Sequence, residues 1–377
     1  SFWLTNSSSS QVAEHIYRLT MSQGKVKIED RFDLPYAQIG TLVWANTDIR
    51  KAPAPVIYSI SPNADVPKTT LDITINGANF KNNLTVSYGS GIVVDSVQYI
   101  SQELLRTKIT IDSNAVLGKR DITITNPDGQ FVVGSALFEV VSSIPHLWIV
   151  DTDKDTLYQV RVMDTTVVKK WDTKTIASHV TAKGLTYDGT NIWLCSGSLA
   201  QKKIYKINTD SDVLTKTDSI PTPTISGTSN MGIAWESNSM WLVLGPVSPK
   251  GKIYQLDPTN GFIQDSVLAP GRDPRGIVFV NGNLYCNDAD SDLVYLYNKN
   301  NKLWTAQFST PTPPGGTISN RVSTGMTWDS INFWIVNSTG PYDYIFKVSP
   351  TGVVLSYFSS PRPDQNAVLT GIVYTSK

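Results

Sequence analysis

One motif recurs along the second half of this 377-residue chain and constrains its fold more than any other feature. In each copy, a Gly is followed three residues later by an aromatic residue, and a second aromatic residue comes six residues after the first. The copies are GLTYDGTNIWLCS (184–196), GIAWESNSMWLVL (232–244), GIVFVNGNLYCND (276–288) and GMTWDSINFWIVN (325–337). Short apolar segments on both sides of DGTN, ESNS, VNGN and DSIN are typical of β-hairpins.

A third strand that carries an aromatic residue follows each hairpin, and a fourth strand follows the third. Four antiparallel strands therefore recur every 44–49 residues, which is the period and strand number of β-propeller blades. One aromatic residue at a fixed position in every blade predicts packing between blades. The second strands supply Trp3, Trp148, Trp193, Trp241, Tyr285 and Trp334, and the third strands supply Tyr17, Tyr158, Tyr205, Tyr254, Tyr295 and Phe346.

The two ends of the chain complete the count of blades. GIVYTSK (371–377) has the inner-strand pattern, and Trp3 would follow Tyr374 by six residues if Lys377 were joined to Ser1. TLVW (41–44) is a sixth inner strand, and its partner HLWIVD (146–151) resumes after 98 inserted residues. We therefore predict an all-β fold: a six-bladed propeller closed by its N- and C-terminal strands, with a second domain inserted in an inner-strand hairpin. The propeller is expected from residues 1–50 and 144–377, and the insert from residues 51–143.

The insert contains PVIYSISP (55–62), LDITINGANF (71–80) and GKRDITITNPDGQ (118–130). These segments resemble the IPT/TIG family of immunoglobulin-like (Ig-like) domains, which implies a small β-sandwich that acts as a spacer or interaction module. The propeller portion resembles the broad NHL/YncE-like group of six- or seven-bladed propellers. That group ranges from binding modules to lyases and lactonases, so the resemblance implies a fold and leaves the activity open.

Composition and charge argue against nucleic acids and membranes as partners. Charged residues make up 17% of the chain and the formal net charge is zero, so we expect no binding to nucleic acid or to an anionic membrane. No apolar run approaches the ~18 residues of a membrane span, so no transmembrane segment is expected. The two cysteines, Cys195 and Cys286, are predicted to be buried free thiols, and they do not decide the compartment.

The inner strands of a propeller line its channel, and here the segments TLVW, GLTY, GIAW, GIVF, GMTW and GIVY contain no Asp, Glu, His, Lys or Arg. They cannot supply the ligands of a lactonase-type metal site or an acid–base pair. DTDKDT (151–156) offers Asp151, Asp153 and Asp155 as a calcium candidate, but the Gly and the distal Glu of an EF-hand loop are missing. Closely spaced Asp residues also favour tight turns without a metal. We expect no other cofactor.

The expected positions of the insert and the termini on the propeller predict which face binds a partner. The insert and both termini lie in inner hairpins, so we expect them to project from the hairpin face and to leave the opposite face free. The loops that lead into the inner strands open on that face, which we name the lead-in face, and variable loops on a rigid scaffold often bind ligands. The candidate binding residues are Lys183, Asn230, Arg272, Asp273, Arg275, Asn320, Arg321 and Arg362.

These observations favour a non-enzymatic extracellular, cell-surface or virion-surface protein that binds a protein or glycan and belongs to a larger assembly. Two alternatives remain open. One is a propeller enzyme of the lyase or lactonase type that acts from the lead-in loops, and the other is a carbohydrate-binding propeller with sites between blades.

Overall fold

The computed structural model describes residues 53–199, 202–245, 250–338, 343–362 and 367–376, together with the backbone of residues 2–6, 14–22 and 25–34. These parts are all-β, and their only helical segments are the 3-10 turns η1 (Thr173–Thr175) and η2 (Ile318–Asn320). None of the helical segments in the described ranges could cross a bilayer.

The Ig-like domain is a sandwich of two four-stranded sheets. One sheet has the order β4-β6-β9-β8 and the other has the order β5-β11-β10-β7. The strands are β4 (Val56–Ser61), β5 (Ala64–Asp65), β6 (Thr70–Ala78), β7 (Thr85–Ser87), β8 (Ile92–Ser101), β9 (Leu104–Ile111), β10 (Gly118–Thr125) and β11 (Phe131–Val140). Alternate residues of β6 and β9 are buried, as one-sided burial of a strand requires, and Ile73, Ile75 and Ile109 lie fully buried between the sheets.

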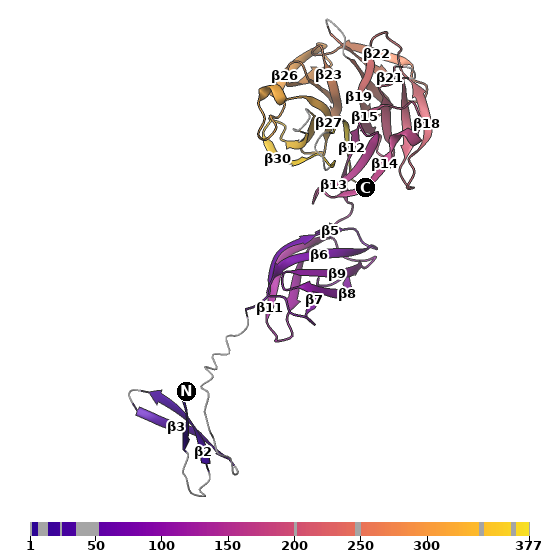
Figure 1. Ribbon diagram of the computed structural model, residues 1–377. Helices are drawn as coiled ribbons and strands as arrows, with labels where there is room; N and C mark the ends of the chain where they lie inside the picture. The colour runs from indigo at the N-terminus through magenta and orange to yellow at the C-terminus, as the bar shows by residue number, and fades with distance from the viewer. Residues whose placement is uncertain are drawn as a thin grey trace.

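Five further four-stranded sheets follow in the order of propeller blades (Figure 1). Four of them use consecutive strands: β15 (Ala182–Tyr187) to β18 (Thr215–Pro221), β19 (Ser229–Glu236) to β22 (Ile263–Leu268), β23 (Pro274–Val280) to β26 (Leu303–Ser309), and β27 (Ser323–Trp328) to β30 (Val354–Ser359). Their middle strands are β16 (Ile192–Ser196), β17 (Lys203–Asn208), β20 (Ser239–Gly245), β21 (Lys252–Leu256), β24 (Asn283–Asp288), β25 (Leu293–Asn298), β28 (Phe333–Asn337) and β29 (Tyr344–Val348).

The fifth sheet joins two distant parts of the chain. The C-terminal strand β31 (Leu369–Ser376) pairs with β12 (Pro145–Asp151), which is followed by β13 (Thr156–Arg161) and β14 (Val167–Asp172). Leu147 lies opposite Tyr374, and Trp148 lies opposite Val373. The inner strands β31, β15, β19, β23 and β27 contact one another in a closed cycle, so the ring closes within residues 145–376.

A glycine in each inner strand permits this close approach. A Cβ on Gly232 would lie 2.2 Å from the carbonyl oxygen of Arg275, and one on Gly371 would lie 2.1 Å from that of Lys183. Gly184, Gly276 and Gly325 make the same kind of contact with the next inner strand. Since real Cβ atoms cannot come so near a backbone, these positions require glycine.

The predicted number of blades is therefore wrong. Phe2–Asn6 (β1) pairs with β2 (Glu14–Ser22), and β2 pairs with β3 (Lys25–Leu34), in a separate three-stranded sheet. β31 pairs with β12 and not with the SFWLTN segment. The predicted sixth inner strand (41–44) lies outside the described residues. The described ring is one or two blades smaller than the resemblance to NHL/YncE-like propellers implies, and it does not use β1, β2 or β3.

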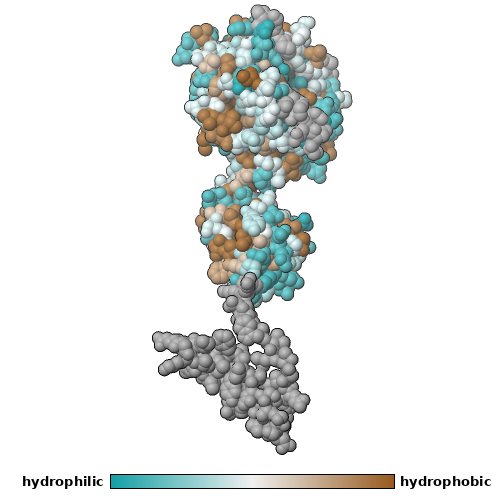
Figure 2. Space-filling model, turned by 60° about the vertical axis from the view of Figure 1, so that its left-hand side comes forward, coloured by the Kyte–Doolittle hydropathy of each residue, from teal (hydrophilic) through white to brown (hydrophobic). Residues whose placement is uncertain are grey.

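The register places the Ig-like domain relative to the two faces. Pro145, at the start of β12, lies opposite Ser376 at the end of β31, and Asp151 lies opposite Leu369. Because inner strands run from the lead-in face to the hairpin face, the chain from the Ig-like domain joins the propeller at the hairpin face. This position agrees with the prediction. Figure 2 shows separate apolar patches on the Ig-like domain and on the propeller.

Candidate functional site

A hollow of about 250 Å³, the axial funnel, lies where the inner strands end at the hairpin face. One half-buried aromatic residue from each blade lines it: Tyr187, Trp235, Phe279, Trp328 and Tyr374. Small and apolar residues such as Leu185, Ile233 and Met326 complete the lining. No Asp, Glu, His, Lys or Arg is among the described residues that line it. The funnel therefore offers apolar and aromatic surface without an acid–base pair.

The channel beneath the funnel is nearly closed. A second hollow on the axis has a volume of about 10 Å³ and is lined by the five inner-strand glycines with Leu185, Ile233, Ile277 and Met326. That space holds about one water molecule. The close approach of the inner strands thus gives the axial funnel a floor.

The tryptophans of the funnel differ from the other described tryptophans in the hydrogen bonding of their indole N–H groups. Six of the eight tryptophans in the fully described ranges donate this hydrogen to the protein: Trp148, Trp171, Trp193, Trp241, Trp304 and Trp334. Trp235 and Trp328 have no such partner among the described residues, and both line the funnel. Neither nitrogen is among the buried polar atoms that lack a partner, so both donors are accessible to solvent.

A larger cavity of about 410 Å³, the interblade cavity, lies between the β12–β14/β31 blade and the β15–β18 blade. Its lining includes amide and carboxylate side chains that the funnel lacks, namely Gln159, Asn208 and Asp210, beside Trp148. His146 also lines it, and burial, together with the charge of Arg161, lowers the pKa of its imidazole. Tyr187 and Thr375 line both hollows, so the two are neighbours on the hairpin face.

The predicted packing role of the outer aromatic residues is confirmed for most of the described blades, but it is wrong for Tyr295, because Tyr297 is the buried aromatic residue of β25. Trp148 stacks on Trp171 with ring centroids 5.3 Å apart and packs with Tyr205 of the next blade. Trp193, Trp241, Trp334, Tyr254 and Phe346 are buried between blades in the same way. Trp3 and Tyr17 lie in the N-terminal sheet, outside the ring.

Two of the candidate residues in the lead-in loops are structural. Asn230 is fully buried, and its amide donates to the carbonyl of Ser196 and to Thr222. Arg362 is 8% exposed, and its guanidinium donates to Asp151 at 3.4 Å and to Asp153 at 2.9 Å. Neither side chain is positioned to meet a partner at the surface.

Most of the other candidates bond within their own loop or to a neighbouring turn. The guanidinium of Arg275 pairs with Asp273 at 2.7 Å, and that of Arg272 pairs with Asp290 at 2.8 Å. The remaining two act locally: the Asn320 side chain accepts from the Thr317 backbone, and Arg321 donates to Thr312.

Lys183 and Arg275 lie near one another at the lead-in end of the channel. Burial, together with the charge of Arg275, lowers the pKa of the Lys183 ammonium. Ligand binding at this face stays a prediction.

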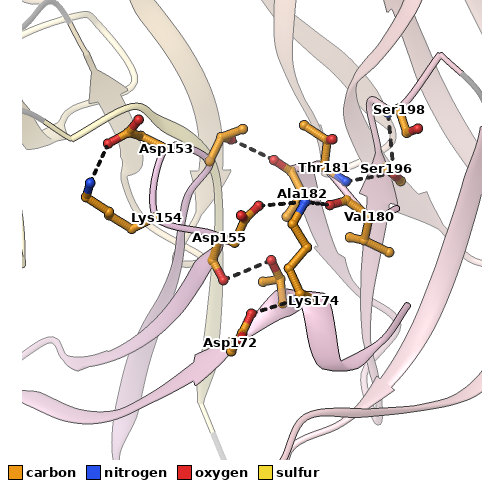
Figure 3. Close-up of polar contacts among 12 residues, drawn as sticks. Asp153, Lys154, Asp155, Asp172, Lys174, Val180, Thr181, Ala182, Ser196 and Ser198 are labelled. Atoms are coloured by element: carbon orange, nitrogen blue, oxygen red, sulfur yellow. Dashed lines mark hydrogen bonds and ion pairs between the residues drawn. The ribbon is translucent and has the colours of Figure 1, made fainter. Parts of the chain in front are cut away.

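The calcium candidate residues are paired with basic side chains. Asp151 is fully buried and accepts hydrogen bonds from the backbone of Asp153 and from Arg362. The Arg362 bond and the charge of Lys154 lower the pKa of the Asp153 carboxyl. Asp155 points to Lys174, with the two charged atoms 3.1 Å apart (Figure 3). Within the described residues no three His, Cys, Asp or Glu side chains are grouped as a metal site requires.

The two cysteines are free and fully buried, as predicted. The Gly184 N–H donates to Cys195 Sγ at 3.1 Å, at the irregularity where β15 meets β16. Burial raises the pKa of the Cys195 thiol to about 12, and it raises the pKa of Cys286 as well. Both thiols therefore act as core groups.

The sequence analysis used the inner-strand aromatic residues to align the repeats and did not assign them to a site. A signal was present, because each first aromatic residue of a copy ends an inner strand and therefore approaches the axis in a ring. That position is distinct from those of the aromatic residues that pack between blades.

Residues 55–140 match the family described as the IPT/TIG domain. The match covers β4 to β11 and confirms the predicted identity of the Ig-like domain. No curated protein matches the chain.

Several solved structures resemble this chain at low identity. A chain of a nidogen/laminin complex is 12% identical with a TM-score of 0.42, and the similarity covers 61% of this chain and 98% of that one. An auxiliary nutrient binding protein from Bacteroides ovatus is 12% identical with a TM-score of 0.37, covering 85% and 90%. Glutaminyl cyclase from Myxococcus xanthus is 12% identical with a TM-score of 0.41, covering 53% and 88%. Similarity at this level carries no function to this chain.

Proposed function

We propose that this chain is a non-enzymatic glycan-binding protein of an extracellular, cell or virion surface, and that the axial funnel takes the ligand. The IPT/TIG domain serves as the spacer or docking module that connects the propeller to a larger assembly. This location differs from the predicted one, because the funnel opens on the hairpin face.

One observation carries the proposal: among the described residues, the two tryptophans whose indole N–H has no protein partner both belong to the aromatic ring of the funnel. A sugar ring presents a flat C–H face to an aromatic side chain and hydroxyl oxygens to a nearby donor. The funnel offers aromatic faces and accessible N–H donors together in one concave hollow, as ligand sites do.

Binding is favoured over catalysis by what lines the funnel. Hydrolysis or elimination on a glycan needs a positioned acid and base, usually carboxylates. The described lining holds neither carboxylates nor imidazoles. The tyrosines are poor bases at neutral pH, and burial raises the pKa of Tyr374 further. An enzyme of the lyase or lactonase type would have to work elsewhere on the chain.

The experiment is binding of the full-length protein to an array of neutral and acidic glycans, followed by titration of the bound glycan. Trp235→Phe and Trp328→Phe keep the ring and remove the donor, and each should weaken binding by about 3- to 10-fold, the value of one hydrogen bond. Trp328→Ala also removes the stacking surface and should weaken binding more. Trp304→Phe is the matched control, because Trp304 is half-buried on β26 and bonds to the Leu268 carbonyl outside the funnel.

Absence of any glycan binding, or a Trp328→Ala variant that binds like the wild type, would overturn the proposal. Conversion of the bound glycan to a shorter or unsaturated product would overturn its non-enzymatic part.

A further inference from the structure

We infer that the glycan is a neutral linear oligosaccharide that runs from the axial funnel across Tyr187 into the interblade cavity. The inference rests on the proposed glycan-binding function and adds the class of glycan and its path.

The path follows from the shared lining of the two hollows. Tyr187, the last residue of β15, lines the funnel and the interblade cavity, as does Thr375 on the adjoining strand β31. The Tyr187 hydroxyl donates to the Gly189 carbonyl at 2.7 Å, which fixes the ring to its hairpin. If one sugar residue of the oligosaccharide packed on Tyr187, the preceding and following sugar residues would lie over the funnel and over the cavity. The combined surface therefore suits a chain of several units better than a single sugar.

The polar groups of the interblade cavity suit a hydroxyl-rich chain. The amide of Gln159 is half-buried and has no hydrogen-bond partner among the described residues. Asn208 uses its side-chain oxygen for the backbone N–H of Asp210 at 2.8 Å, which leaves its NH₂ group available. The lowered pKa of His146 keeps its ring neutral near pH 7. Amides and neutral rings that alternate with aromatic faces match alternating hydroxyl edges and C–H faces of sugars.

The charges along the path select against anionic glycans. The funnel has no charged group in its described lining, and Asp210 is the one carboxylate that lines the cavity. Asp210 is exposed and has no ion pair among the described residues. A uronate or sulfate would meet this negative charge with no described cation in the lining to balance it. The path is thus suited to neutral sugars.

Gln159 has a matched counterpart elsewhere in the ring. Gln255 occupies the equivalent position of β21, where it donates to Ser239 Oγ at 2.8 Å. Gln255 hydrogen-bonds within its own blade, whereas the Gln159 amide lines the cavity and has no such bond among the described residues. Replacing the two residues separately distinguishes a loss of ligand contact from a general effect on a blade.

The experiment is titration of the full-length protein with oligomers of glucose, N-acetylglucosamine and mannose, from the disaccharide upward, and with oligogalacturonate. We expect the affinity for one neutral series to rise by about tenfold or more as the chain lengthens, with no binding of oligogalacturonate. Gln159→Ala should lower the affinity for the longer oligomers by about 3- to 10-fold and leave the affinity for the disaccharide unchanged. Gln255→Ala should bind oligomers of every length with the affinity of the wild type.

An affinity that does not depend on length, equal behaviour of Gln159→Ala and the wild type, or preference for oligogalacturonate would each overturn the path. The Trp328→Ala variant distinguishes failure of the proposed path from failure of the proposed glycan-binding site. If Trp328→Ala abolishes binding while length has no effect, the funnel remains the site and the path fails. If no neutral oligomer binds, the path fails as well.

Discussion

The indole nitrogen of Trp148 donates a 3.0 Å hydrogen bond to the hydroxyl oxygen of Thr375, 227 residues further along the chain. Three hairpins of the ring make the same contact within one loop: Trp193 donates to Asp188, Trp241 donates to Glu236 and Trp334 donates to Asp329. In each hairpin the acceptor follows the first aromatic residue of the repeat, and Thr375 likewise follows Tyr374. The antiparallel pairing of β31 with β12 is therefore equivalent to the inner hairpin of the other blades, although no turn connects the two strands.

Removal of the Thr375 hydroxyl should weaken this closure. Thr375→Val keeps the shape of the side chain and leaves the N–H of Trp148, a residue that is 6% exposed, without a partner. We expect the free energy of unfolding to fall by about 1–3 kcal/mol, the cost of an unsatisfied buried donor. Denaturant unfolding measures the change, and Thr375→Ser should retain most of the stability. Equal stability of the Val and Ser variants would show that the bond does not support the ring.

Deletion of each end of the chain distinguishes the described ring from the six-bladed one. Loss of residues 369–377 removes β31, including the buried Leu369 and Ile372, and exposes the edge of β12. We expect a large fall in the melting temperature and aggregation through the open edges. Loss of residues 1–34 should leave the propeller transition unchanged, because β1 to β3 pair only among themselves. A propeller that unfolds on loss of residues 1–34 would restore the six-bladed closure.

Arg362 should stabilise the ring through a buried charge. Arg362→Ala leaves the fully buried Asp151 without its guanidinium, and breaking a buried ion pair in this way costs about 3–5 kcal/mol. Thermal and denaturant unfolding measure this loss.

The same site tests the calcium prediction, because the guanidinium occupies the position between Asp151 and Asp153 that a cation would take. We expect millimolar Ca²⁺ to leave the melting temperature of the wild type unchanged. A calcium-dependent rise would support a metal at these residues.

His146 should make stability depend on pH near the junction with the Ig-like domain. Burial, together with the charge of Arg161, lowers its pKa below the ordinary value of 6.5. The unfolded chain then binds a proton at a higher pH than the folded chain does. Stability should therefore fall as pH drops from 6.5 toward the folded pKa, and be regained as pH rises.

His146→Gln removes this titration. Denaturant unfolding between about pH 7.5 and about pH 5 should show a smaller loss of stability in the variant than in the wild type. Equal losses would mean that His146 does not contribute.

Local patterns in the sequence are sufficient to predict the all-β class, the four-stranded repeat, the Ig-like domain and most of the aromatic packing between blades. Each of these depends on short-range patterns, because turn residues, alternation and aromatic spacing act within one hairpin or one strand. The match of residues 55–140 to the IPT/TIG domain confirms the strongest of them.

The partner strand of GIVYTSK could not be predicted from local patterns, because an inner strand can pair with any antiparallel edge of similar pattern. The deciding contact is between inner strands, where Gly184, Gly232, Gly276, Gly325 and Gly371 allow backbones to meet. Thr41 stands at this position before Trp44, so that segment carries a Cβ where the ring has no space for one.

Tertiary structure also decided the site. The repeat pattern places Trp235 and Trp328 at the first aromatic position and Trp193 and Trp241 at the second, but it does not show that the first position lines a hollow and leaves its indole N–H without a partner among the described residues. Which face is hollow depends on how closely five inner strands approach one axis. The physical reason is the same in both cases: the sequence specifies strands through neighbours along the chain, whereas closure and cavities arise from contacts between residues far apart in it.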